Sequence, residues 1–153
     1  GLRMGYIVAP ESFIREARAL RATVLGHPPG HVQRTVAYFL SLGHYDAMIN
    51  RMKSAFKRRR QAMDDAIAAE GLSVAGQGGF GGSSIWMQAP EGVDTEVLAT
   101  RLRQDGVLIE PGQGFFEAAR GSFVPQNCYR LAYSSIAIGK IAPGIALIAA
   151  ALR

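Results

Sequence analysis

The residues whose types and spacing could bind a small molecule lie in residues 127–134, Asn-Cys-Tyr-Arg-Leu-Ala-Tyr-Ser. Their alternation predicts a short strand in which Tyr129, Leu131 and Tyr133 share one face while Arg130 takes the other. An arginine among apolar and aromatic residues is costly to hold without an anion, and a carboxylate fits its fork of donors. The segment therefore indicates a site for an amino acid or a carboxylic acid. Taken alone, it equally describes a solvated arginine on the outer face of a half-buried strand, and that simpler interpretation is favoured.

A second arginine that could meet an anion is Arg3, which leads into the apolar residues 4–9. This run predicts a buried strand that stops at Pro10, and Gly5 would permit close approach of the backbone to a ligand. Taken alone, Arg3 is simply the residue at the mouth of that strand.

Residues 76–81 match the dinucleotide-binding pattern Gly-x-Gly-x-x-Gly letter for letter. That pattern works between a strand and the N-terminus of a helix, where backbone amides meet a pyrophosphate. Residues 83–88, which follow it, have the pattern of a strand instead. We therefore reject nucleotide binding and expect a loop whose glycines allow close approach to a small ligand.

Other catalytic and binding classes have little support. His27, His31 and His44 show no metal-ligand spacing with a carboxylate or with Cys128, so no metal site is expected. No order of Ser, His and Asp points to a hydrolase. The basic run at 57–60 is interpreted as the solvated face of a long helix, with a weak contact to DNA phosphates left open.

Composition is that of an ordinary globular protein. The 153 residues are 48% hydrophobic and 19% charged, and 17 basic minus 12 acidic residues give +5. This suits one medium domain or two small ones and does not by itself indicate nucleic acid.

The single Cys128 rules out an internal disulfide and suits a reducing cytoplasm. No signal peptide is visible, and the most apolar run, 141–152, is too short to cross a membrane. Because the first residues enter directly on a strand pattern without a methionine, we expect a piece of a longer protein.

Hydrophobic periodicity and breakers predict an alternation of helices and strands. Helices are expected from Phe13 to Val24, from Val32 to Leu40, at 45–70, between Asp94 as N-cap and Gly106, and at 141–152. Strands are expected at 4–9, 83–88, 107–109 and around Arg130. The best internal boundary lies near Gly71, which divides the chain into residues 1–70 and 71–153.

Four patterns, taken in order, resemble the C-terminal part of fold type I pyridoxal-phosphate enzymes, the aspartate aminotransferase superfamily. Residues 1–6, Gly-Leu-Arg-Met-Gly-Tyr, are similar to the family's G-x-R-x-G-Y segment. Residues 78–80 followed by Ile85 and Trp86 resemble the glycine–aromatic lead into the strand of the small domain. Residues 107–115 resemble the strand and P-G-x-x-F loop that face the substrate, and residues 129–134 match the R-L-x-[FY]-S strand.

The resemblance implies an α/β fold in which 1–70 completes the large cofactor-binding domain, including its long connecting helix, and 71–153 forms the small domain. It implies that Arg3 contacts the phosphate of pyridoxal 5'-phosphate, and that Arg130, Gly79 and Phe80 bind the substrate. The family's Schiff-base lysine lies upstream of the phosphate-binding arginine, hence before Gly1. This chain's three lysines, Lys53, Lys57 and Lys140, all follow Arg3, so no catalytic residue and no catalysis are expected of the chain itself.

Within the superfamily, two segments resemble the MocR branch of GntR-type transcriptional regulators in particular. They are residues 27–29 and residues 43–45 leading to 50–52. That resemblance implies a cytoplasmic, homodimeric protein that senses an amino acid or amino-carboxylate and contacts DNA through a separate N-terminal domain. A free-standing aminotransferase is the alternative. A bare interaction module is the third class, favoured if the chain were a complete natural product.

Overall fold

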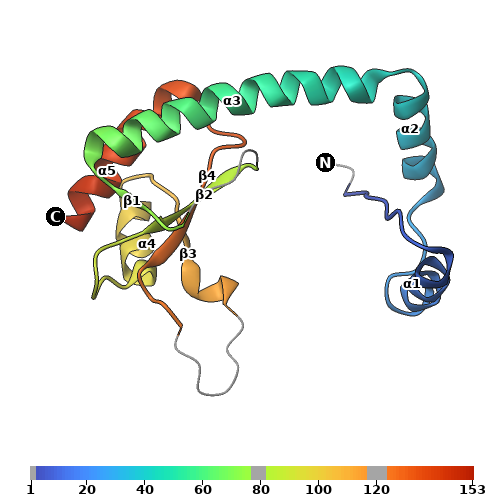
Figure 1. Cartoon of the computed structure of the whole chain (residues 1–153), viewed down its shortest axis with the longest axis horizontal. Coiled ribbons are helices and arrows are strands. Elements are labelled where there is room, and N and C mark those ends of the chain that lie inside the picture. The colour runs from blue at the N-terminus through green and yellow to red at the C-terminus, as the bar shows by residue number, and fades with distance from the viewer. Residues whose placement is uncertain (1–2, 77–81, 117–123) are drawn as a thin grey trace. The chain divides into compact units, whose positions relative to one another are not determined.

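The structure is a computed structural model that describes residues 3–76, 82–116 and 124–153. Packing divides the chain into two compact units, Gly1–Arg51 and Met52–Arg153. The long helix α3 (His44–Glu70) passes through the junction between them (Figure 1). The division at Gly71 that the sequence suggests therefore stays a prediction, since the packing units separate inside this helix.

The first unit contains two complete helices, preceded by a segment without regular secondary structure. Helix α1 (Glu11–Val24) and helix α2 (Gly30–Ser41) follow the apolar spacing of their sequences, and neither contains a buried residue. The strand expected at residues 4–9 is wrong for this structure, because no described segment pairs with them. A strand needs a neighbour for its backbone hydrogen bonds, and a run of apolar residues cannot supply one.

Helix α3 begins at His44, where the sequence predicted a helix from about residue 45. Its C-terminal half buries Met63, Ala66 and Ile67 in the second unit. Gly71 ends it with a φ of +67°, a left-handed conformation that glycine adopts without the steric penalty of a side chain.

A four-stranded antiparallel sheet forms the centre of the second unit. Its strands are β1 (Ser73–Val74), β2 (Ser84–Gln88), β3 (Glu110–Pro111) and β4 (Cys128–Ala132), in the spatial order β1-β2-β4-β3. The strands predicted at 83–88 and around Arg130 are confirmed. The third strand is shifted from 107–109 to Glu110–Pro111, because only those two residues pair with β4.

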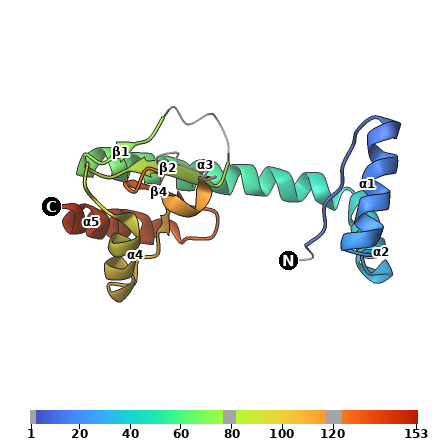
Figure 2. The same ribbon diagram turned by 90° about the horizontal axis from the view of Figure 1, so that it is seen from below.

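One face of this sheet carries the hydrophobic core. Helices α3, α4 (Thr95–Gln104) and α5 (Ile141–Leu152) pack on that face, with α4 and α5 on the same side of the strands in Figure 2. Short 3-10 helices η1 (Gly112–Phe115) and η2 (Ile138–Lys140) follow β3 and precede α5. The core side chains come mainly from β2, β4 and the three helices: Met63, Ile67, Ile85, Met87, Leu98, Leu102, Tyr129, Leu131, Tyr133, Ile141, Ile145 and Ile148.

The expected mixed α/β class is confirmed by this arrangement. Within the described residues, no helix combines the length and the apolar character needed to cross a membrane.

Candidate functional site

Arg130 stands on the face of β4 opposite the core. The strand sends Tyr129 and Leu131 into the core, where they are 1% and 5% exposed. Burial raises the pKa of the Tyr129 phenol to about 12, so this side chain is neutral in the fold. Alternation then places Arg130 on the other face, as the sequence predicts. Its side chain is half-buried, with 37% exposure.

The neighbouring strands place one residue on each side of Arg130. Glu110 of β3 and Trp86 of β2 are its direct register partners. The Nη2 atom of Arg130 donates a hydrogen bond to Oε2 of Glu110, and the two side chains form an ion pair. Arg130 thus lies on the outer face of the strand, as the simpler interpretation expects, but it is partly covered and charge-paired within its own sheet.

Aromatic rings cover part of the guanidinium. The Cζ atom of Arg130 lies 4.7 Å from the centroid of the Phe115 ring, a cation–π distance. The Trp86 ring meets Phe115 edge-on at 5.5 Å and Phe116 at 6.0 Å between centroids. The Nε atom of Arg130 is buried and has no hydrogen-bond partner among the described residues. The arginine thus keeps hydrogen-bonding capacity in surroundings where water is partly excluded.

Close packing fixes the loop that carries Phe115. A Cβ atom at Gly112 would overlap the backbone carbonyl of Cys128 in β4, so only glycine fits this position. The next residue, Gln113, bonds to two residues at the start of α4. Its Oε1 lies 3.0 Å from the hydroxyl of the fully buried Thr95, and its Nε2 donates to the carboxylate of Asp94 at 3.3 Å. The loop, the N-terminus of α4 and β4 therefore hold one another in place.

Helix α3 packs against the other end of β4. Phe56 meets the ring of Tyr133 edge-on at 6.2 Å, and Nη1 of Arg59 donates to the carbonyl of Ser134 at 2.6 Å. Arg60 pairs with Asp64 through hydrogen bonds of 2.8 Å, which raise the pKa of Arg60. Two of the four cations at 57–60 are thus engaged within the chain, and the solvated-face interpretation holds for Lys57 and Arg58 alone.

An open groove of about 900 Å³ lies beside the ion pair between Arg130 and Glu110. Arg130 and Glu110 line it together with exposed apolar side chains, among them Leu108 and Leu147. A ligand on Arg130 would therefore have both a charged and an apolar surface within reach.

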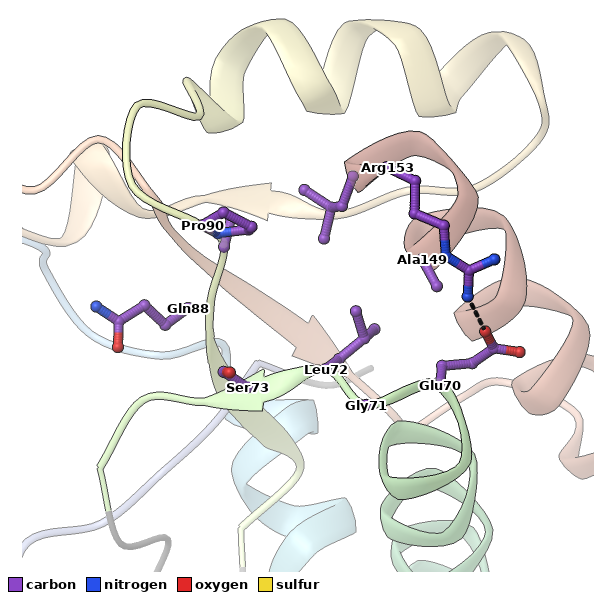
Figure 3. Close-up of a pocket in the computed structure, with 10 residues that line it drawn as sticks. Glu70, Gly71, Leu72, Ser73, Gln88, Pro90, Ala149 and Arg153 are labelled. Atoms are coloured by element: carbon purple, nitrogen blue, oxygen red, sulfur yellow. Dashed lines mark hydrogen bonds and ion pairs between the residues drawn. The ribbon is translucent and has the colours of Figure 1, made fainter.

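A second pocket of about 300 Å³ lies at the C-terminal end of α3 (Figure 3). Glu70 and Arg153 form an ion pair of 3.1 Å across it, drawn as the dashed line. Its remaining lining is apolar or neutral: Gly71, Leu72, Ser73, Gln88, Ala89, Pro90, Ala149 and Leu152. This pocket lies between the C-terminal ends of α3 and α5, and its carboxylate, Glu70, is paired with Arg153.

Of the other predicted site residues, Arg3 is among the residues that the structure describes. Arg3 is exposed and has a φ of +51°, a left-handed conformation that non-glycine residues rarely adopt. It belongs to the first unit and Arg130 to the second, so a shared site stays a prediction. Gly79 and Phe80 lie outside the described residues. The described part of the chain contains no group of three His, Cys, Asp or Glu residues placed to hold a metal ion.

Sequence reasoning missed Glu110 as the partner of Arg130 and Thr95 with Gln113 as the anchor of the loop. Both depend on contacts between segments 18 to 20 residues apart. A carboxylate ending one apolar segment and an arginine inside another were a usable signal. Only the strand register, however, places them opposite each other.

Comparisons with known proteins agree with this geometry. The family model of aminotransferase class I and II matches residues 1–137, and the chain belongs to this family. The chain superimposes on the α-aminoadipate aminotransferase LysN of Thermus thermophilus, crystallised with N-(5'-phosphopyridoxyl)-L-leucine. The TM-score is 0.81 at 26% identity, over 95% of this chain and 36% of that one. The expected relationship to fold type I aminotransferases is confirmed.

A regulator and a transaminase are among the curated relatives that match along the whole chain. The HTH-type transcriptional regulator TauR of Rhodobacter capsulatus is 64% identical over 153 residues, which is 31% of its length. The 2-aminoadipate transaminase of Thermus thermophilus is 30% identical over 155 residues, which is 38% of its length. The chain thus spans about a third of the length of these relatives. The lean toward the regulator branch agrees with the higher identity.

Proposed function

We propose that this chain is the C-terminal part of an effector-sensing, aminotransferase-like domain in a MocR/GntR-type transcriptional regulator. The observation that carries the proposal is the 64% identity to a regulator along all 153 residues, against 30% for a transaminase. The full-length protein would be a cytoplasmic homodimer that contacts DNA through a separate N-terminal domain. It would bind pyridoxal 5'-phosphate and an amino acid or amino-carboxylate.

Arg130 would bind the carboxylate of the effector. Its guanidinium is half exposed, lies against Phe115 and has a buried Nε with no partner among the described residues. A carboxylate can accept two parallel hydrogen bonds from such a fork, an interaction about twice as strong as a neutral hydrogen bond. Gly79 and Phe80, which precede β2 in the sequence, would contact the same ligand.

Arg3 would bind the phosphate of the cofactor. Its side chain is exposed and forms no ion pair with any described residue, so an external anion can reach it. When bound, pyridoxal phosphate supplies an electron sink for chemistry at an amino group. The lysine that attaches it would lie outside this chain, so the chain's own residues would bind and orient without catalysing.

The signal would arise from differential binding. An effector that meets Arg130 better in one arrangement of the domain shifts the protein toward that arrangement. The change would reach the DNA-binding domain through the elements that contact β4 or the residues after it. Helix α3 is the longest of these elements.

A free-standing aminotransferase is the second candidate. It is favoured by the TM-score of 0.81 to the Thermus thermophilus enzyme and by the 30% identity to a transaminase. In that case Arg130 would hold the carboxylate of the substrate, and activity would need the same upstream lysine.

The test is Arg130→Ala in the full-length protein loaded with pyridoxal phosphate. The probe is β-alanine, with propylamine as the amine that lacks a carboxylate. Loss of a charged hydrogen-bonded pair should weaken the β-alanine response about tenfold or more and leave the propylamine response unchanged. The absorbance of the bound cofactor before addition should equal that of the wild type.

The readouts are the cofactor's visible spectrum and the β-alanine dependence of DNA binding. An unchanged dose-response to β-alanine in Arg130→Ala would contradict the role of Arg130. Amino transfer to a 2-oxo acid without any DNA binding would favour the enzyme instead.

A further inference from the structure

Glu110 already occupies part of the fork that a ligand would use. Its Oε2 atom accepts from Nη2 of Arg130, while the buried Nε of Arg130 has no partner among the described residues. The pair therefore has one contact where a bidentate carboxylate would have two. The guanidinium has five N–H donors, so a ligand that meets it with two oxygens can form a second contact that Glu110 does not make.

Glu110 can leave Arg130 without disturbing the sheet. Its backbone pairs in the two-residue strand β3, but its side chain is 47% exposed at the rim of the groove. Exposed ion pairs stabilise a fold only weakly, so water can replace Arg130 as the partner of Glu110 at little cost.

For Arg130, replacement of Glu110 by water is less favourable, because Phe115 and Trp86 lie beside it. Phe115 lies against the guanidinium and Trp86 lies against Phe115, so the rings limit access of water to Arg130. When Glu110 departs, another anion therefore satisfies Arg130 better than water does. Glu110 is placed to act as a counter-ion of Arg130 that stays until a ligand replaces it.

We propose that Glu110 is an intrachain competitor for the carboxylate site on Arg130, so that it sets the affinity for anionic ligands. This inference rests on the proposed carboxylate-binding role of Arg130. Because Glu110 remains beside the site after displacement, it also disfavours ligands with a second negative charge.

The experiment measures propanoate binding by calorimetric titration of the full-length protein at constant ionic strength. Glu110→Gln keeps the size of the side chain and removes its charge, and it should bind propanoate about two- to fivefold more tightly. Neutral propanamide should bind both proteins alike. The affinity for succinate should rise more on this substitution than the affinity for propanoate does.

The matched control is Glu91→Gln, which removes the same charge from an exposed residue that has no ion pair among the described residues. It should leave propanoate binding as in the wild type. Glu110→Ala is the second variant, and it should change propanoate binding in the same direction as Glu110→Gln.

Unchanged or weaker propanoate binding in both Glu110 variants overturns the inference, because Glu110 would then position Arg130 rather than compete for it. If Arg130→Ala weakens propanoate binding in the same series, the proposed role of Arg130 survives that failure. If Arg130→Ala has no effect, the proposed role itself fails and the inference fails with it.

Discussion

At the scale of single residues, Arg130 shows how one side chain acquires a function from its neighbours. Its own strand determines only which face it takes. Glu110, Phe115 and Trp86 then determine its charge partner and its access to water. Each of these neighbours belongs to another segment of the chain.

Gly112 is the residue on which the position of Phe115 depends. Gly112→Ala would place a methyl group against the backbone carbonyl of Cys128, which cannot rotate away. We expect the free energy of unfolding to fall by about 1–3 kcal/mol, as for other overpacked sites. Chemical denaturation followed by circular dichroism measures the change.

Gly114→Ala is the matched control in the same loop, because a Cβ atom there meets nothing within 4 Å. Its free energy of unfolding should stay close to that of the wild type. Equal losses in the two variants would show that the loop, rather than the contact with Cys128, determines the effect.

At the scale of elements, helix α4 is an example of local prediction that succeeds. Asp94 was expected as its N-cap, and its Oδ1 accepts a hydrogen bond of 2.8 Å from the backbone N–H of Glu96. The cap and the apolar spacing both lie within one short segment. Strand β3 is the contrasting case, because its limits depend on β4, some twenty residues away.

The cap of α4 can be tested by Asp94→Ala. This change removes the acceptor for Glu96 and also the partner of Gln113, so unfolding should become easier by about 1–2 kcal/mol. Thermal and chemical unfolding curves measure the loss. Asp94→Asn keeps an acceptor oxygen, and we expect it to retain most of the stability; a loss equal to that of alanine would contradict a capping role.

At the scale of the whole molecule, the two units differ in how much they bury. Helices α1 and α2 contain no buried residue, whereas the hydrophobic core lies wholly within Met52–Arg153. The first unit exposes apolar side chains instead, among them Tyr6, Val8, Leu20 and Leu25.

Fragments test this difference. We expect a fragment of residues 52–153 to unfold in one cooperative transition, because burial of its core drives folding. A fragment of residues 1–51 should show no cooperative transition, since none of its described residues is buried. Circular dichroism during heating distinguishes the two, and a sharp transition in the shorter fragment would contradict the assignment.

By itself, the sequence determined the helices, the class of fold, the face that Arg130 occupies and the family. These follow from periodicity, capping residues and short motifs, all of which act over a few neighbouring residues. Tertiary structure alone decided that residues 4–9 lack a strand partner here and that β3 begins at Glu110. It also decided that a carboxylate of the chain itself meets Arg130. The physical reason is that strand register and ion pairing join segments distant in sequence, and no local pattern specifies which distant residue arrives.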